Sequence, residues 1–167
     1  MPPSEPLSPR PAFRLVAFLA LMCFCALALP ARGAPQYGFA GGSSVRVIGN
    51  DTGGRLKTRF AEIRALRSRG ERVEIRGRYC LSACTLYLGA GNVCVDPDTR
   101  FGFHGPGYPS RPIRRERFEY WSQRMATYYP PGVQGWFLSR ARYVTSGYLT
   151  LMGADLIRMG VSRCRDS

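Results

Sequence analysis

The sequence predicts an α/β domain in which a mainly parallel sheet is layered against helices. Three observations predict this class: short β-branched or alternating segments, apolar residues that repeat at helical spacing between them, and glycine or proline turns at the junctions. Strands that alternate with helices pair in parallel through right-handed crossovers. With 167 residues, of which 45% are hydrophobic, the chain is long enough for one domain with a buried core.

The first segment has the pattern of an export signal. Two arginines precede an apolar run, residues 15–29, and small residues follow it. We therefore assign residues 1–34 to a signal peptide and residues 35–167 to the folded domain. The apolar run is short for a membrane span, which leaves an uncleaved N-terminal membrane anchor as the alternative. In either case the domain is expected in the periplasm or outside the cell.

Removal of this segment leaves four cysteines, Cys80, Cys84, Cys94 and Cys164. An even number of cysteines in an exported chain indicates two disulfides. We prefer Cys80–Cys84 with Cys94–Cys164, because the first two are close in sequence and a bond to the last would tie down the C-terminus. The other connectivities stay open. A metal site is the competing interpretation, but the chain has a single His and no CxxC pair, so no metal is expected.

The first half of the domain alternates between strands and helices. A β-branched strand at 45–48 runs into a turn at 49–54, which contains capping side chains and a glycine pair. Apolar residues at spacings of four, three and three predict a helix over 55–69. Strict alternation predicts a strand over 72–78 with one polar face, and residues 79–85 form a second strand-to-helix junction.

The second half continues this alternation up to the last residues. Its expected elements are a short helix at 86–91, strands at 93–95 and 100–104, a helix at 113–129, a helical stretch at 136–144 and a short helix at 153–159.

Three features of the junctions carry candidate chemistry. Ser82 lies where a strand enters a helix, so its hydroxyl would project beside the exposed N–H groups of a first helical turn. His104, the only His in the chain, ends a strand among glycines. Gly53 and Gly54 could offer backbone N–H groups to an oxyanion. Each feature also has a purely structural interpretation: a helix cap, an ordinary surface or core His, and a tight turn.

The order of these features resembles that of the Clp protease proteolytic subunit, in the ClpP/crotonase superfamily. The resemblance covers roughly residues 45–162, and the segments 80–85 and 101–106 look like those of small exported ClpP-like proteins of bacteria. It implies a ClpP/crotonase-like layered β-α-β fold and a serine hydrolase that acts on a peptide or another acyl substrate. By this resemblance Ser82 is the nucleophile and His104 the general base.

The same resemblance implies an oxyanion hole made by Gly53 or Gly54 together with the N–H of Ala83. Crotonase relatives bind acyl-CoA, but the sequence shows no adenine-site signature and its export signal argues against that ligand, so no cofactor is expected. Relatives assemble into rings, which leaves a homo-oligomer open for this shorter chain.

One residue of the family pattern is missing. The Clp peptidases orient the imidazole with an acidic residue, whereas this chain has no Asp or Glu between Tyr120 and Ala154. Thr145, Ser146 or a backbone carbonyl would then have to orient His104. The alternative function is accordingly a non-catalytic ClpP-like protein that binds a peptide or another cell-envelope partner in the same cleft.

The chain is strongly basic, with a net charge of +13 and 23 arginines against one lysine. The densest cluster, residues 111–117, indicates either contact with an anionic envelope surface or binding of nucleic acid. We expect a solvated helix face instead, because glutamates interleave with the arginines. Nucleic acid is the least expected partner.

Overall fold

The computed structural model describes residues 44–108 and 110–165. The strands are β1 (Val45–Ile48), β2 (Arg72–Ile75), β3 (Tyr79–Leu81), β4 (Val93–Val95), β5 (Arg100–Phe103), β6 (Leu149–Met152) and β7 (Ser162–Arg163). The helices are α1 (Leu56–Ser68), α2 (Arg115–Ala126), α3 (Pro131–Ser139) and α4 (Gly153–Arg158), with 3₁₀ helices η1 (Ser82–Gly89) and η2 (Ala141–Tyr143). The predicted signal peptide, residues 1–34, lies outside the described residues.

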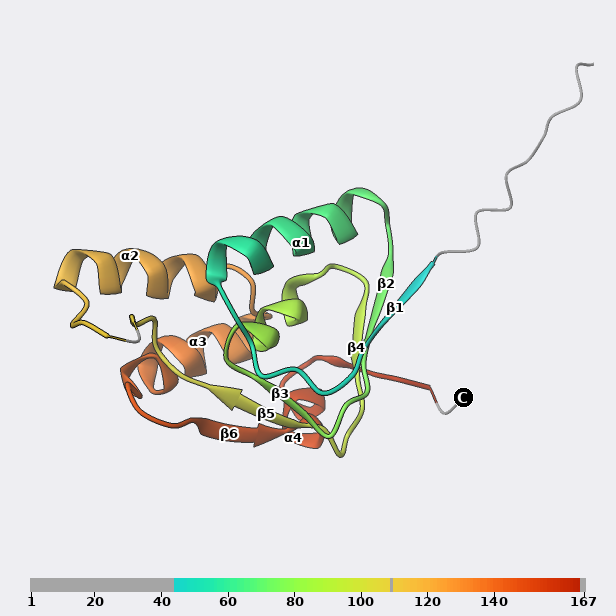
Figure 1. Cartoon of the computed structure of the whole chain (residues 1–167). Helices are drawn as coiled ribbons and strands as arrows, with labels where there is room; N and C mark the ends of the chain where they lie inside the picture. Colours follow the sequence, from blue (N-terminus) through green and yellow to red (C-terminus); the bar gives the residue numbers. More distant parts are fainter. Residues whose placement is uncertain (1–43, 109, 166–167) are drawn as a thin grey trace, which may run out of the picture. The chain divides into compact units, whose positions relative to one another are not determined.

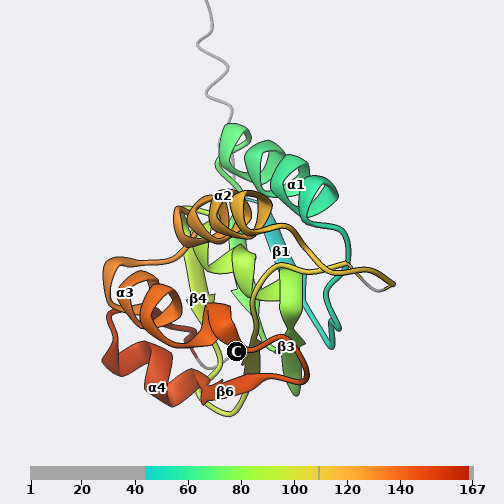
Figure 2. The same cartoon turned by 90° about the vertical axis from the view of Figure 1, so that its left-hand side faces the viewer.

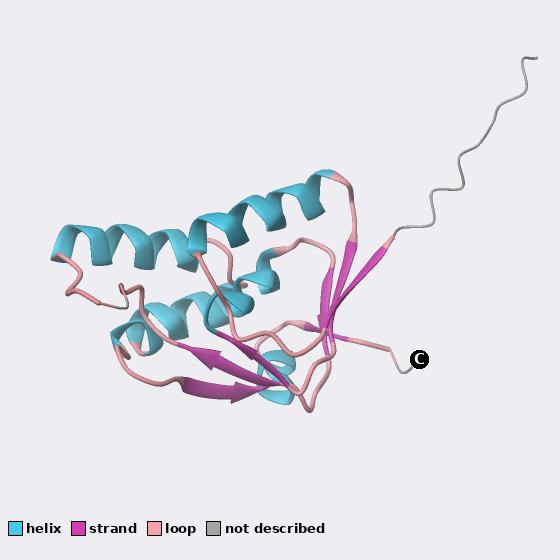
Figure 3. Ribbon diagram, viewed as in Figure 1, coloured by secondary structure: helices cyan, strands magenta, loops and turns pink. Residues whose placement is uncertain are grey.

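The strands form two sheets, and pairing is mainly parallel as predicted. The first sheet has the order β1-β2-β4-β7 and is parallel throughout. The second has the order β3-β5-β6, in which β3 and β5 are parallel and β6 is antiparallel. Helices α1 and α2 lie on one side of the domain and the second sheet on the opposite side (Figures 1 and 3), as the view turned by 90° also shows (Figure 2).

Helix α1 packs one apolar face onto the core. Its buried residues Phe60, Ile63 and Leu66 follow the spacing that predicted the helix. The ring of Phe60 stacks on Trp121 of α2 at 6.3 Å and against Tyr128 at 4.6 Å. The two helices are therefore joined through aromatic packing.

The predicted strand over 72–78 is split in two. Strand β2 ends at Ile75, and the chain then passes so close to the turn after β1 that a Cβ on Gly77 would lie 2.3 Å from the carbonyl carbon of Gly49. The N–H of Arg78 donates to Oδ1 of Asn50 at 2.7 Å. These contacts redirect the chain into the second sheet, where it continues as β3.

Other boundaries also differ from the sequence prediction. Strands β6 and β7 were not expected, and β6 adds the antiparallel edge. The helical stretch expected at 136–144 begins earlier, with Pro131 at the first helical position, which suits proline because that position needs no N–H donor. The helix that follows Ser82 is a 3₁₀ helix.

The structure contains two disulfides, Cys80–Cys84 and Cys94–Cys164, in the pairing we preferred. Disulfides persist in oxidising compartments, so they are compatible with an exported protein. Among the described residues no helix is both long enough and apolar enough to cross a membrane.

Candidate active site

Ser82 and His104 meet at the same end of two neighbouring strands. Strands β3 and β5 are parallel and pair Leu81 with Gly102, so their carboxyl ends lie side by side. Ser82 is the first residue after β3, and His104 is the first after β5. The hydroxyl Oγ of Ser82 lies 2.7 Å from Nε2 of His104, within hydrogen-bond distance.

The other ring nitrogen of His104 faces a backbone carbonyl. Nδ1 lies 2.7 Å from the carbonyl oxygen of Gly105. A carbonyl oxygen can only accept, so this bond requires the proton on Nδ1 and leaves the lone pair of Nε2 to accept from Ser82. This is the tautomer in which an imidazole can remove a hydroxyl proton. Among the described residues no hydrogen bond joins His104 to Thr145 or Ser146, so the partner of Nδ1 is the backbone carbonyl of Gly105.

The backbone of Ser82 has an unusual conformation. Its φ is +54°, and it is the only non-glycine residue with positive φ in the described part of the chain. Such backbone costs about 1–3 kcal/mol and persists only where its surroundings impose it. The buried disulfide between Cys80 and Cys84 encloses Ser82, and the hydroxyl of Thr85 donates to its carbonyl at 2.8 Å. The side chain of Ser82 caps no helix and pairs with His104 instead.

Gly53 of the glycine pair lies directly against the serine, whereas a Cβ on Gly54 would meet nothing within 4 Å. A Cβ on Gly53 would be 2.6 Å from Cβ of Ser82 and 2.9 Å from the backbone nitrogen of Ala83, and its φ of +106° also favours glycine. The N–H of Gly53 donates to Oδ1 of Asp51 at 2.6 Å. Within the described ranges, apart from bonds inside helices and strands, neither the N–H of Gly54 nor that of Ala83 donates a backbone hydrogen bond. These two groups, rather than the N–H of Gly53, are the ones that remain for an oxyanion.

A network of charged side chains holds this glycine loop in place. Nη2 of Arg59 lies 2.6 Å from Oδ2 of Asp51 and also donates to the carbonyl of Gly53 at 3.3 Å. The guanidinium lies over the ring of Tyr87 at 4.2 Å and pairs with Glu62, which accepts from the Tyr87 hydroxyl. Burial, with help from Glu62, raises the pKa of Tyr87 above its ordinary value, which keeps this hydroxyl a donor.

Sequence reasoning did not identify Asp51 or Arg59 as parts of the site. Asp51 precedes the glycine pair by two residues, a spacing typical of an aspartate that accepts from the backbone of a turn. That signal was available in the sequence. Arg59 had no such signal in the sequence, because an arginine on the polar side of a helix is common.

An open cavity of about 520 Å³ lies beside His104. Its walls include Tyr108, Ile113 and Thr145, together with the backbone that follows the histidine. The ring of Tyr148 packs edge to face against the imidazole, with ring centroids 5.5 Å apart. A substrate that enters this cavity would reach the histidine without displacing the core.

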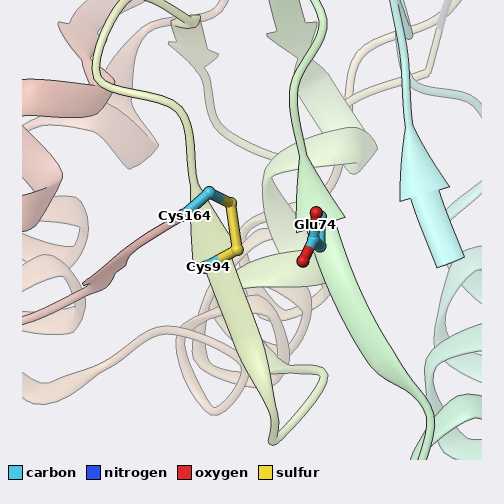
Figure 4. A group of neighbouring side chains, drawn as sticks. All are labelled: Glu74, Cys94 and Cys164. Atoms are coloured by element: carbon cyan, nitrogen blue, oxygen red, sulfur yellow. A yellow bond between two sulfur atoms is a disulfide. The ribbon is translucent and has the colours of Figure 1, made fainter. Parts of the chain in front are cut away.

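The cysteine near the C-terminus belongs to a structural cluster. Cys94, Cys164 and Glu74 bring their Sγ and carboxylate atoms within 4.8 Å of one another, but the two sulfurs are bonded to each other (Figure 4). A disulfide sulfur is not a thiolate ligand. Glu74 also pairs with Arg72 at 2.8 Å and with Arg76 at 2.7 Å, and these hydrogen bonds lower its pKa. The group therefore joins strands β2 and β4 to the residue that follows β7.

The basic cluster lies next to the candidate site. Arg111, Arg114 and Arg117 line a second cavity of about 410 Å³, together with Tyr108 and Pro112. We expected a solvated helix face for this segment. The arginines are indeed exposed, but they also form the walls of a hollow.

The sequence matches no protein-family model and no curated protein. The function is therefore argued from the geometry of the site.

Proposed function

We propose that this protein is an exported serine hydrolase, of the ClpP/crotonase type, that cleaves peptides or other acyl substrates with Ser82 and His104. The observation that carries the proposal is the 2.7 Å contact between Oγ of Ser82 and Nε2 of His104, with Nδ1 on the carbonyl of Gly105. The mainly parallel α/β fold and the order of glycine pair, serine and histidine support the superfamily assignment. The two disulfides and the N-terminal sequence pattern support export.

The first chemical step forms an ester on the serine. As Oγ of Ser82 attacks the acyl carbon, its proton passes to Nε2 of His104, and a tetrahedral oxyanion forms. The bond to the leaving group then breaks, and the leaving group takes the proton from Nε2. In the second step a water molecule gives a proton to Nε2 and attacks the ester. Collapse releases the acid, and Ser82 recovers its proton from His104.

Backbone N–H groups stabilise the oxyanion in this scheme. The N–H of Ala83 lies at the first turn of η1 directly after the nucleophile, and the N–H of Gly54 comes from the loop packed on Ser82. One well-placed donor contributes about 3–4 kcal/mol in a characterised protease. The left-handed backbone of Ser82 resembles the sharp strand-to-helix turn on which other hydrolases present their nucleophile.

The carbonyl of Gly105 takes the place of an acidic residue. It selects the productive tautomer of His104, but it carries no full negative charge to stabilise the imidazolium that forms. Disruption of the acid–imidazole interaction lowers kcat by about 10⁴-fold in a characterised triad. We therefore expect slow turnover of substrates. Reactive probes should still label Ser82, because labelling needs only the nucleophile and its base.

The direct test is the mass of the intact, oxidised protein after exposure to a fluorophosphonate. One adduct is expected on the unmodified chain and none on Ser82→Ala or His104→Ala. Ser139→Ala is the matched control, because Ser139 lies on α3 and bonds only to its own helix. Failure of the unmodified protein to react would overturn the proposal.

The missing acid favours a second candidate, a non-catalytic protein that binds a peptide or another cell-envelope partner in the same cleft. Turnover by the unmodified chain separates the two functions: a hydrolase turns over an acyl substrate and loses this activity in Ser82→Ala, whereas a binding protein binds its ligand without turnover both before and after this change.

A further inference from the structure

The two cavities on this face of the molecule adjoin each other. The cavity beside His104 and the arginine-lined cavity share three lining residues, Tyr108, Arg111 and Pro112. The two cavities are therefore neighbours around the same three residues. Their combined walls run from the imidazole to the first turn of α2, where Arg114 and Arg117 lie.

The second cavity is positively charged and has no internal counter-charge. Within the described ranges, none of Arg111, Arg114 and Arg117 has a carboxylate within ion-pair distance, and no acidic residue lines the cavity. The nearest acidic residue along the chain, Glu116, is exposed on α2 outside the lining, and Glu119 is paired with Arg142 at 2.7 Å. The three guanidinium groups are therefore available to an external anion.

Two features prepare this cavity for a carboxylate. Arg111 lies over the ring of Tyr108 at 4.6 Å, which limits the orientations of its guanidinium. Helix α2 begins after Arg114 without a side-chain cap, and Arg114 and Arg117 at this positive end of the helix line the cavity. A guanidinium binds a carboxylate through two parallel hydrogen bonds, a geometry that a lysine cannot offer.

We propose that this arginine cavity, formed by Tyr108, Arg111, Pro112, Arg114 and Arg117, binds a carboxylate of the substrate. The substrate class is then acidic peptides, or acyl compounds that carry a carboxylate close to the bond that is cleaved. The inference rests on the proposed hydrolase function, whose general base His104 lines the adjoining cavity.

The first test needs no catalysis. Fluorescence anisotropy on Ser82→Ala protein compares a blocked, labelled oligo-glutamate peptide with the oligo-glutamine peptide of the same length. We expect the glutamate peptide to bind about tenfold tighter or more, with an affinity that falls as salt rises. The triple variant Arg111→Gln, Arg114→Gln, Arg117→Gln should abolish the preference.

The matched control removes the same charge elsewhere. Lys57→Gln, Arg64→Gln, Arg163→Gln changes three exposed residues that line neither cavity. This control should keep the preference for glutamate. Equal binding of the two peptides, or equal loss in both triple variants, would overturn the proposal. Tighter binding of a short DNA duplex than of the glutamate peptide would also overturn it, in favour of nucleic acid.

The second test separates this inference from the function on which it rests. Steady-state kinetics compare the mono-p-nitrophenyl ester of glutaric acid with p-nitrophenyl butyrate, and we expect KM about tenfold lower for the charged ester. If both esters are hydrolysed with equal KM and the two peptides bind equally, the carboxylate site is refuted and the hydrolase function stands. If the glutamate peptide binds but neither ester is hydrolysed, the hydrolase function is refuted and the carboxylate site stands.

Discussion

Arg59 holds the carboxylate of Asp51 at 2.6 Å, and that carboxylate also accepts the N–H of Gly53. The ion pair thus joins α1 to the glycine loop that packs on Ser82. It touches no reacting atom in the proposed mechanism. It acts by positioning the backbone from which the N–H of Gly54 would meet the oxyanion.

Substitutions at Asp51 should separate positioning from folding. Asp51→Ala removes both the ion pair and the acceptor for Gly53, and it should slow fluorophosphonate labelling of Ser82 by roughly tenfold to a hundredfold, less than loss of a donor itself. Asp51→Asn keeps an acceptor oxygen and should recover part of the rate. Asp98→Ala, in an exposed turn, is the control. Equal rates for Asp51→Ala and Asp51→Asn, with both folds intact by circular dichroism, would contradict the positioning role.

Gly53 should tolerate no side chain. In Gly53→Ala the new Cβ would lie 2.6 Å from Cβ of Ser82 on a backbone with φ of +106°, so the loop must move away from the serine. We expect loss of labelling and a decrease of about 1–3 kcal/mol in the free energy of unfolding. Gly49→Ala is the matched control, because a Cβ there meets nothing within 4 Å. Normal labelling of Gly53→Ala in time-resolved mass spectrometry would show that the loop does not serve the site.

The two disulfides should have different roles. Cys94–Cys164 closes a long loop with a sequence separation of 70, whereas Cys80–Cys84 has a separation of only 4. Loop entropy then predicts a stabilisation of about 4 kcal/mol for the first and about 2 kcal/mol for the second. Cys94→Ala, Cys164→Ala should therefore lower Tm more, as calorimetry would measure.

The short disulfide should matter more for reactivity, because it encloses Ser82. Cys80→Ala, Cys84→Ala should slow fluorophosphonate labelling at a temperature where the protein is still folded. Cys94→Ala, Cys164→Ala should label at the normal rate under the same conditions. The reverse ranking of the two double variants would refute this division.

Glu74 should make stability depend on pH in the acid range. Hydrogen bonds from Arg72 and then Arg76 lower the pKa of Glu74 below its ordinary value of 4.5. A lowered pKa stabilises the folded state above pH 4.5, and this contribution is lost as the pH falls through the folded-state pKa. Urea unfolding at neutral and at acid pH gives the free energy of unfolding under each condition. This free energy should fall less at acid pH in Glu74→Gln than in the unmodified chain, by up to about 1 kcal/mol. If the free energy of unfolding changes between the two pH values by the same amount in both proteins, the stabilising role of Glu74 is contradicted.

Local patterns were sufficient for many elements of the fold. The spacing of Phe60, Ile63 and Leu66 predicted both the helix and its buried face, and the mainly parallel pairing followed from the alternation of strands and helices. The prediction of one strand over 72–78 was wrong because of a tertiary contact. Its alternation continues past Ile75, but the close approach of Gly77 to Gly49 bends the chain into another sheet. Gly77 within the alternation is a local signal of a close approach, but it does not say which segment approaches.

The candidate site was likewise predictable only in part from local patterns. Glycine turns and strand ends are local features, so the residue pattern alone predicted that Ser82, His104 and the glycine pair lie at element junctions. Whether they meet depended on the parallel register of β3 and β5. The carbonyl of Gly105, the ion pair of Arg59 with Asp51 and the arginine cavity were decided only by tertiary structure. The reason is physical: residue spacing fixes periodicity within one element, whereas distances between separate segments depend on how their buried faces pack.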